Sequence, residues 1–401
     1  MGLSTTMRAI LGWLVGAIHV MDDVIPMRLV AVICLLALAA SRPSPSFATG
    51  AELYARYCLL CHGAHLEGYA ADNTPSLVSP TFRATASDAF LRAAIERGRA
   101  RTAMAGYGRA VGGPLGPADV VALVAYIRGG TTAPAPLARK PSTGSAATGR
   151  EVYVANCQSC HGTAEQRATA VHLANAMFLA TASDAYLRAA IVRGRPGTPM
   201  QGWGEVLSAR EIEDVIAYVR SLARAVPPAP APPAGVTADG QMRTIENVPV
   251  VVNPTGEQAT FTLREDRYVS VADVAKAYDE KRRLVLIDAR TPSDYLRMHI
   301  TGAISIPYFN MHNLDNVPND GTWVIAYCAC PHHVSGVVME ELRKRGYPHT
   351  AVLDEGVFLW QQQGHPVVAA EGQLPIPAPP PNGAPVAMSN TVDDSLDPPP
   401  R

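Results

Sequence analysis

The chain has almost no net charge and few aromatic residues. Its 401 residues carry 34 Lys and Arg against 35 Asp and Glu, giving a formal net charge of −1, and both signs are mixed along the sequence. No basic stripe is present that would neutralise phosphates, so we expect no nucleic-acid partner. Aromatic residues make up 6% of the chain, whereas its 34 prolines indicate a large share of linker. This length suits two to four small domains.

An uninterrupted N-terminal apolar run of membrane-spanning length is also missing. Residues 29–40 form a shorter run that follows a basic start and leads to Ser46-Phe47-Ala48, a small-x-small cleavage pattern. These features are typical of a secretory signal. We therefore interpret residues 1–48 as a signal peptide or N-terminal extension and expect a periplasmic protein. The alternative is that this segment stays uncleaved and anchors the protein to the membrane.

Cysteine is scarce, with seven residues in the chain. Cys34 lies in the presumed signal, and six cysteines in an exported chain of this size do not resemble a disulfide framework. They form three local pairs instead: Cys58/Cys61, Cys157/Cys160 and Cys328/Cys330. The spacing indicates local chemistry at three places.

Proline-rich and small-residue segments divide the chain. Residues 131–148 and 226–242 cannot bury a core and are predicted to be spacers, and residues 371–401 are predicted to form a disordered tail. The expected folded domains span residues 49–130, 149–225 and 243–370.

The first two blocks are an internal repeat. G-A-E-L-Y-A-R-Y-C-L-L-C-H-G at Gly50 corresponds to G-R-E-V-Y-V-A-N-C-Q-S-C-H-G at Gly149. Apolar stripes at helical spacing predict helices, and Ser208 with Glu211 forms a capping box before the last one. Gly98 and Gly194 are expected to end the middle helices. We predict three helices joined by long loops in each copy, with too small a core to be stable alone.

Each copy contains C-x-x-C-H, at Cys58–His62 and at Cys157–His161. Two thiols one helical turn apart reach both vinyl groups of a haem, and the adjacent His62 or His161 points at the iron. A lone motif would also suit a redox C-x-x-C or half of a zinc site. Its repetition in an exported chain favours haem.

A sixth iron ligand is expected from the loop before the last helix of each copy. Met104 and Met200 occupy matching points there, each followed by Gly, an aromatic residue and Gly. A thioether ligand favours Fe(II) and raises the reduction potential. His65, His172 and Met177 occur in one copy only, so we assign them to surface or packing.

Both blocks resemble class I c-type cytochromes over almost their whole length. The resemblance implies two covalently bound haem c groups, one held by Cys58, Cys61, His62 and Met104, the other by the corresponding residues Cys157, Cys160, His161 and Met200. It also implies electron transfer with redox partner proteins of an electron-transport chain.

The third block alternates apolar strands with helices. The runs L-V-L-I-D at Leu284, A-I-S-I at Ala303, W-V-I-A-Y-C at Trp323 and T-A-V-L-D at Thr350 predict an open, mostly parallel α/β sheet. Chemistry in such sheets sits at the carboxyl ends of strands, where Cys328 is expected. The fold class is therefore two all-α domains followed by an α/β domain.

Residues 265–368 resemble the rhodanese family, through I-D-A-R-T-P-S-D-Y, H-I-T-G-A-I-S-I-P, the strand ending Y-C, and L-D-E-G-V-F-L-W. The resemblance implies that Cys328 is a nucleophile that carries sulfane sulfur between small sulfur compounds. This loop departs from the family pattern. Pro331 stands where a Gly is usual and His333 where an Arg is expected, so thiosulfate binding is less favoured. Ser335 comes one place late.

The loop C-A-C-P-H-H-V-S leaves alternatives open. In one, Cys328 forms a persulfide and His332 or His333 assists; in another, Cys328 and Cys330 close a strained, easily reduced disulfide. A zinc or copper site from the two Cys and two His is less favoured, because one short loop rarely supplies four ligands. The remaining alternative is that the domain is an inactive rhodanese fold used for docking. We expect an exported dihaem cytochrome whose last domain handles a sulfur species, with a plain electron carrier or a sulfurtransferase as alternatives.

Overall fold

The computed structural model describes residues 48–69, 74–132, 134, 140–228, 249–329 and 332–375. The predicted signal segment, most of the second linker and of the C-terminal tail, and Cys34 and Cys330 lie outside these ranges. No helix in the part of the chain that the structure describes has the length and apolarity needed to cross a membrane.

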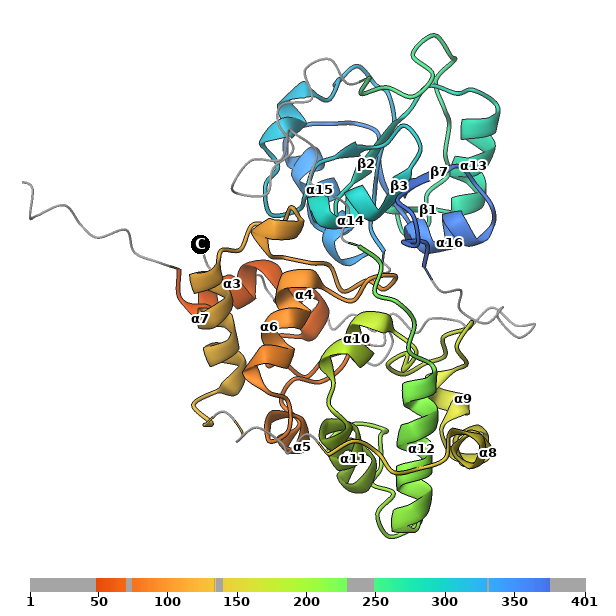
Figure 1. The fold of residues 1–401 in the computed structure, drawn as a ribbon. Helices are drawn as coiled ribbons and strands as arrows, with labels where there is room; N and C mark the ends of the chain where they lie inside the picture. Colours follow the sequence, from red (N-terminus) through yellow and green to blue (C-terminus); the bar gives the residue numbers. More distant parts are fainter. Residues whose placement is uncertain are drawn as a thin grey trace, which may run out of the picture. The chain divides into compact units, whose positions relative to one another are not determined.

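The two copies of the repeat are helical, as predicted (Figure 1). Copy one contains α3 (Gly50–Tyr57), α4 (Leu59–His62), α5 (Pro80–Arg83), α6 (Asp88–Arg97), η1 (Arg109–Val111) and α7 (Pro117–Arg128). Copy two contains α8 (Ala146–Asn156), α9 (Gln158–His161), α10 (Ala176–Thr181), α11 (Asp184–Arg193) and α12 (Ala209–Ser221). The three longer helices of each copy match the prediction. The shorter ones were missed, because segments of three to six residues carry no periodic signal.

Side-chain caps fix where these helices begin. Ser208 accepts a hydrogen bond from the Glu211 amide (3.2 Å), and Glu211 accepts one from the Ser208 amide (2.8 Å), which confirms the predicted capping box. Thr49 and Glu52 form the same arrangement at the start of α3. Helices α3 and α12 therefore begin directly after their capping residues.

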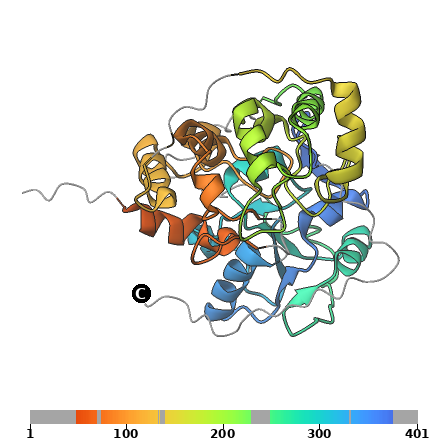
Figure 2. The same ribbon diagram turned by 90° about the horizontal axis from the view of Figure 1, so that it is seen from below.

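The two copies share one hydrophobic core. Phe90 of α6 and Tyr186 of α11, which occupy equivalent places in the repeat, stack with ring centroids 4.9 Å apart, and Phe178 of α10 meets Phe90 edge-on at 6.1 Å. Figure 2 shows copy one in orange and copy two in yellow to green, both built from helices and loops. A core shared in this way removes the need for either small domain to be stable alone.

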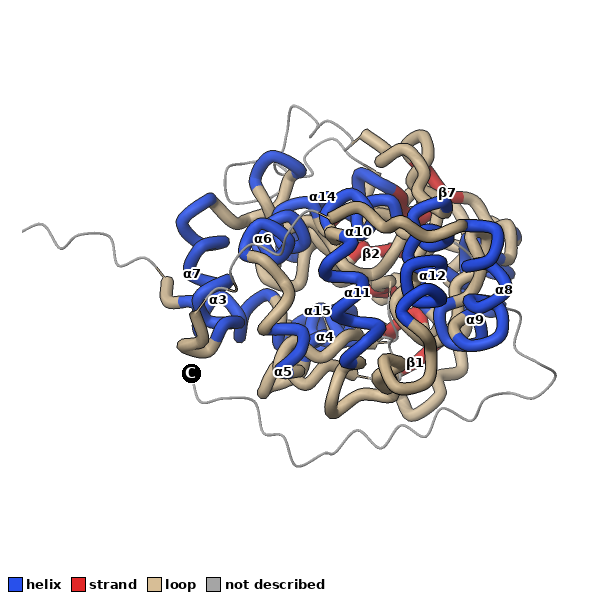
Figure 3. Tube along the Cα trace, turned by 60° about the horizontal axis from the view of Figure 1, so that its bottom comes forward, coloured by secondary structure: helices blue, strands red, loops and turns tan. Residues whose placement is uncertain are grey.

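The third block is an open α/β domain. Its five-stranded sheet has the order β1-β6-β5-β2-β4, every neighbouring pair being parallel, and β3 pairs with β7 in a separate antiparallel ribbon. The strands are β1 (Tyr268–Val269), β2 (Val285–Asp288), β3 (Met298–Ile300), β4 (Ile304–Ser305), β5 (Val324–Tyr327), β6 (Thr350–Leu353) and β7 (Val367–Ala369). Figure 3 shows these strands in red. The fold class expected from the sequence is confirmed.

Helices cover both faces of this sheet (Figure 1). Helices α13 (Val271–Asp279) and α16 (Gly356–Gln362) share one core with β1, β5 and β6, and α15 (His333–Lys344) packs into the core on the other face. A further helix, α14 (Pro292–Arg297), and the 3-10 helix η2 (His312–Asn316) complete the domain. Strand β5 ends at Tyr327, so Cys328 lies at the carboxyl end of a central strand, as predicted.

Candidate functional sites

The first C-x-x-C-H segment forms a tight helical turn. Helix α3 ends at Tyr57, and the His62 amide then donates to the Cys58 carbonyl at 2.9 Å. Cys58 and Cys61 are thus one turn apart, as attachment to two vinyl groups requires. The buried Tyr54 hydroxyl donates to the Gly63 carbonyl at 2.6 Å and holds the turn in place.

The second C-x-x-C-H segment has the same geometry. The His161 amide donates to the Cys157 carbonyl at 2.9 Å, and the buried Tyr153 hydroxyl donates to the Gly162 carbonyl at 2.9 Å. The sequence repeat is therefore also a repeat of hydrogen bonds.

The two histidines are held neutral. Burial lowers the pKa of His62 to about 4; the Pro75 carbonyl acts in the opposite direction, although Nδ1 makes no hydrogen bond of normal geometry. Burial also lowers the pKa of His161, whose Nδ1 lies 2.7 Å from the Val171 carbonyl. Nδ1 must donate in that contact, which leaves Nε2 with a free lone pair. This is the tautomer of metal-bound histidine.

The thiols are not tuned for redox chemistry. Cys58, Cys61, Cys157 and Cys160 are unbridged, and burial raises the pKa of Cys58 to about 12 and that of Cys157 to about 11. Reactive cysteines have lowered pKa values, so Cys58 and Cys157 suit anchoring rather than disulfide exchange. Together with the histidine tautomer, the residues present fit haem c.

The two methionine loops are built alike. The Arg99 amide donates to the Met104 carbonyl at 2.8 Å, and the Arg195 amide donates to the Met200 carbonyl at 2.7 Å. Gly98 has φ 68°, and a Cβ there would stand 2.4 Å from the Ala105 carbonyl carbon. Gly194 has φ 62° and makes the same close approach to its loop. Each helix-ending glycine thus lets the methionine loop fold against the helix.

Three residues near the haem motifs occur in one copy only, and they lie at surface or core positions. His65 is exposed, and Met177 is buried in α10. His172 is buried, with Nε2 2.6 Å from the Thr163 carbonyl. In each case the surroundings agree with the expectation from the sequence.

Cys328 is buried at the end of β5, with 1% of its surface exposed. The Ser335 hydroxyl donates to its Sγ at 3.3 Å, and the Val357 amide donates to its carbonyl at 2.9 Å. Gly356, at φ 70°, packs so closely that a Cβ would stand 2.6 Å from the Cys328 carbonyl oxygen. Sequence reasoning noted Ser335 only as displaced from the family position. Ser335 lies two residues into α15, the helix that follows Cys328. This position at the start of the next helix is the sequence signal that could have identified it.

The two predicted histidine assistants lie in different surroundings. His332 adopts a left-handed conformation (φ 70°), its Nε2 lies 2.5 Å from Asp354 Oδ1, and its ring is 4.0 Å from the Tyr268 ring. His333 begins α15, and its ring meets that of Tyr69 of copy one edge-on at 5.7 Å. The two imidazoles are thus held by different parts of the chain.

A buried ion pair holds the loop after β2. Two nitrogens of Arg290 bond the Asp288 carboxylate at 2.9 and 2.6 Å, and Arg290 also donates to the Met298 carbonyl at 2.5 Å. The attraction to Asp288 raises the pKa of Arg290 even though burial acts against it. This pair is structural: it ties β2 to β3.

Copy one contacts the α/β domain at the strand-end loops. Leu60, between the two cysteines of the first motif, packs against the core that contains Cys328 and α15. Tyr57 meets Phe309 edge-on at 5.2 Å, and the Arg56 guanidinium donates to the Phe309 carbonyl at 3.0 Å. The first C-x-x-C-H motif and the Cys328 loop therefore adjoin the same interface.

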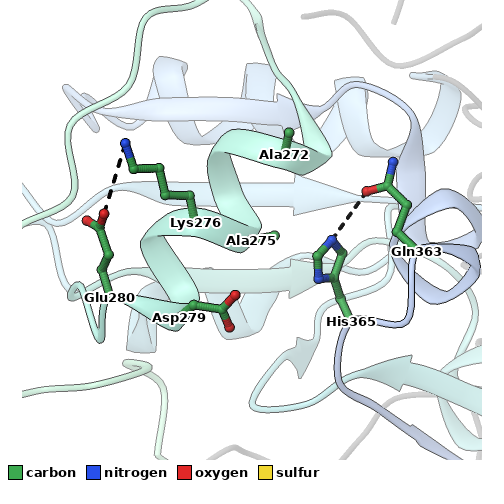
Figure 4. Close-up of a pocket in the computed structure, with 7 residues that line it drawn as sticks. All are labelled: Ala272, Ala275, Lys276, Asp279, Glu280, Gln363 and His365. Carbon is green, nitrogen blue, oxygen red and sulfur yellow. Dashed lines mark hydrogen bonds and ion pairs between the residues drawn. The ribbon is translucent and has the colours of Figure 1, made fainter.

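A shallow hollow of about 590 Å³ lies elsewhere on the α/β domain, between α13 and the segment after α16 (Figure 4). Its polar groups pair with one another: Lys276 lies 4.0 Å from Glu280, and His365 Nε2 lies 3.2 Å from Gln363 Oε1. None of the predicted site residues lines it. Among the residues with described positions, no group of three or more His, Cys, Asp or Glu side chains forms a metal site, and Cys330 is outside that set.

Family models match all three blocks. Residues 45–127 and 144–219 match the model for cytochrome c oxidase, cbb3-type, subunit III, and residues 270–363 match the rhodanese-like domain. The chain thus consists of tandem c-type cytochrome domains, which bind haem c and transfer electrons, and a rhodanese-like domain with a sulfur-related role.

One curated relative and several solved structures are similar to parts of the chain. An uncharacterized protein of Synechocystis is 29% identical over 85 residues, which are 21% of this chain, and the chain spans 47% of that relative. A thiosulfate sulfurtransferase from Pseudomonas aeruginosa is 26% identical with a TM-score of 0.24, covering 27% of this chain and 21% of that one.

Two further solved structures are also similar to parts of the chain. A reducing HAO-like protein complex of Kuenenia stuttgartiensis is 19% identical with a TM-score of 0.31, covering 45% of this chain and 99% of that one. A rhodanese-like domain from Anabaena is 21% identical with a TM-score of 0.24, covering 29% and 86%.

Proposed function

We propose that this chain, two c-type cytochrome domains followed by a rhodanese-like domain, is an exported dihaem protein that oxidises a small sulfur compound at Cys328. Export to the periplasm is supported by the signal-like N-terminus and by the fact that c-type cytochrome domains are usually exported. The proposed domains are those predicted from the sequence, 49–130, 149–225 and 243–370.

The observation that carries this proposal is the interface between the first haem motif and the sulfur loop. Leu60 of C-L-L-C-H packs into the core that contains Cys328, and Tyr69 meets His333 at the start of α15. Sulfur chemistry and one-electron chemistry are therefore neighbours within one chain. A plain carrier with an unrelated docking module gives no reason for this placement.

We assign the haem ligands by copy. His62 with Met104, and His161 with Met200, would hold the two irons, and the cysteines of each motif would be the thioether anchors. When bound, haem c supplies a one-electron acceptor at each motif. Two motifs give the two acceptors that a two-electron sulfur oxidation requires.

The proposed reaction forms one sulfur–sulfur bond. With hydrogen sulfide as substrate, the Cys328 thiolate and HS⁻ join to give the Cys328 persulfide anion, one proton and two electrons. The proton leaves to solvent, and the two haem c groups, held by the residues assigned above, would supply the two one-electron acceptors. The persulfide sulfur is then transferred to an acceptor thiol or a second sulfide, which regenerates the thiolate. Atoms and charge balance in each step.

The side chains around Cys328 suit this chemistry. The Ser335 hydroxyl donates to Sγ, which stabilises negative charge on sulfur, and the N-terminus of α15 adds a favourable dipole. His332, paired with Asp354, and His333 are the proposed assistants in place of the usual Arg. In an alternative to persulfide formation, the Cys328 and Cys330 thiols would close a disulfide and release two protons and two electrons to the same two acceptors.

The test is sulfur-dependent reduction of the oxidised holoprotein without oxygen. Sulfide, thiosulfate and polysulfide are added separately to wild type, Cys328→Ser and a control, Val121→Ala, whose side chain is 53% exposed on α7. We expect one donor to raise the α-band absorbance in wild type and control, and the rate to fall at least tenfold in Cys328→Ser. Dithionite-reduced spectra of all three should be identical.

Three outcomes would contradict the proposed function. Equal reduction of wild type and Cys328→Ser would mean that donors reduce haem directly, and the proposed role of Cys328 would be wrong. No reduction by any donor, with Cys328-dependent thiocyanate formation from thiosulfate and cyanide, would favour a sulfurtransferase. If neither assay shows activity, the rhodanese-like domain would be an inactive docking domain. The near-complete burial of Cys328 would agree with that outcome.

A further inference from the structure

We propose that the rhodanese-like domain is part of the first haem site. Ser293 and Tyr308 of that domain hold the loop that carries Met104, and they act as positioning residues for the sixth ligand of copy one. This inference rests on the proposed function only in taking Met104 as a haem ligand.

The Met104 loop is fastened from the rhodanese-like side. The Ser293 hydroxyl, on α14, donates to the Gly106 carbonyl at 2.6 Å, two residues after Met104. Ser293 is 1% exposed, so water does not compete for this bond. Arg297, one turn further along α14, donates to the Arg97 carbonyl at 2.6 Å, at the other end of the same loop.

Tyr308 connects both sides of the first haem crevice. Its hydroxyl donates to the Tyr57 carbonyl at 2.9 Å, immediately before Cys58. The Tyr107 hydroxyl lies 3.3 Å from the same oxygen. A phenol has one proton, so Tyr107 must be the donor to Tyr308. One side chain of the rhodanese-like domain thus bonds the segment before the haem anchors and the loop that carries Met104.

The Tyr107–Tyr308 pair lies close to the haem anchors. Tyr308 is buried and Tyr107 is half-buried, and burial is the main cause that raises the pKa values of both well above their ordinary value. Both phenols therefore stay protonated and keep their hydrogen bonds across the physiological range. The spacing between anchor and ligand loop in copy one is consequently set from outside the cytochrome domain.

Copy two provides the internal comparison. Asn156 replaces Tyr57, and its amide donates to the Val152 carbonyl of its own helix at 2.9 Å. Trp203 replaces Tyr107; its backbone amide donates to the Ile191 carbonyl at 2.8 Å, as the Tyr107 amide does to Ile95, but an indole has no hydroxyl to donate to Tyr308. Within the described residues, no hydrogen bond joins the 200–203 segment to the rhodanese-like domain. Among the residues that the structure describes, hydrogen bonds from the rhodanese-like domain reach the methionine loop of copy one and not that of copy two, whose contact with that domain includes Arg167 over the Phe358 ring at 5.7 Å.

The consequence is a link between the domains through iron ligation. Thioether ligation favours the ferrous state, so a less firmly held Met104 should lower the potential of the first haem. Because Ser293 lies on the helix that follows β2, and Tyr308 lies in the segment after β4, both are attached to the sheet that carries Cys328, and a change at the sulfur site would reach Met104 through them.

The experiment is a potentiometric titration of the full-length holoprotein with chemical mediators. Met104→Ala and Met200→Ala assign the two one-electron waves. The test variants are Ser293→Ala, Tyr308→Phe and their combination, and Ser221→Ala on the exposed end of α12 is the matched control. Circular dichroism and thermal melting confirm that each variant is folded.

We expect the combined variant to lower the potential of the first haem and to weaken the methionine-to-ferric-iron charge-transfer band, with the second wave unchanged. Tyr308→Phe alone should give a smaller shift in the same direction. Unchanged waves in all folded test variants would overturn the proposal, as would equal shifts of both. If Met104→Ala moves neither wave, the ligand assignment fails and this inference fails with it.

Failure of the proposed function would be visible separately. The titration uses no sulfur compound, so an inert Cys328 leaves its result untouched. Conversely, an unchanged first wave in the Ser293 and Tyr308 variants leaves the sulfur-dependent reduction assay standing.

Discussion

The two cytochrome copies have the same backbone plan but different surroundings for their haem motifs. In copy one the motif reads C-L-L-C-H, and Leu60 packs against the rhodanese-like core. In copy two it reads C-Q-S-C-H, and Ser159 and Cys160 are exposed. Leu60 thus faces the rhodanese-like domain, whereas Ser159, its counterpart in copy two, faces solvent. The difference suggests an inner haem that exchanges electrons within the chain and an outer one that meets redox partners.

What the copies share is equally informative. Arg128 donates to the carbonyls of Arg83 and Ala86 and pairs with Asp88 at 2.8 Å; Arg220 makes the equivalent contacts with Leu179, Ala182 and Asp184. This arrangement joins the last helix to the middle helix in both copies. The scaffold has kept its internal links after duplication, while the surfaces around the two motifs have diverged.

The largest effect should come from removing one pair of anchors at a time. Cys58→Ser/Cys61→Ser and Cys157→Ser/Cys160→Ser should each lose half of the covalently bound haem, because a thioether bond needs the thiol. Pyridine haemochrome spectra measure the content. Sulfur-dependent reduction should vanish in the first variant; in the second it should persist at a lower rate, because the second electron then has to reach the first haem of another molecule. Persistence in both would remove the distinction between inner and outer haem.

The sequence predicted the local features of this comparison well. The repeat, the turn from Cys58 to His62, the glycine that ends each middle helix and the strand end at Cys328 all follow from residues close together in the chain. Gly98 shows the limit: it was predicted to end the helix and it does, with φ 68° and ψ −163°, but its contact with the Met104 loop was not predicted. The close approach of the Met104 loop is what requires glycine there.

The contacts between domains could not be predicted in this way. The stacking of Phe90 on Tyr186 and the bonds from Ser293 and Tyr308 to copy one join positions about a hundred or more residues apart. None of these residues has a local sequence pattern that differs from that of an ordinary core or surface residue. The β3–β7 ribbon was also missed, because its strands have three residues each and are too short to show an alternating pattern.

A smaller difference should appear when the recurring arginine is replaced. Arg128→Met should lower the free energy of unfolding by about 3 kcal/mol, because its side chain is only 6% exposed and the carbonyls it bonds lose their partner. Arg220→Met should lower it by about 1 kcal/mol. Arg220 is 28% exposed, and Asp184 keeps a bond from the Ser142 amide at 2.7 Å. Denaturant unfolding of the holoproteins measures both; equal losses would contradict the ranking.

The smallest effect concerns Glu213, which occupies the place of the exposed Val121 of copy one. Bonds from Arg188, and also from Ser142 and Thr143, lower the pKa of Glu213 to about 2 from 4.5. A carboxyl whose pKa is lower in the folded state stabilises it above the unfolded pKa, and this stability is lost as pH falls from about 4.5 to about 2. Glu213→Gln should therefore flatten the dependence of unfolding free energy on pH in that window, while Val121→Gln, the matched change in copy one, should leave it unchanged. Unfolding in urea at pH 5, 4 and 3 measures the slope. An unaltered slope in Glu213→Gln would mean that the contact does not distinguish the copies.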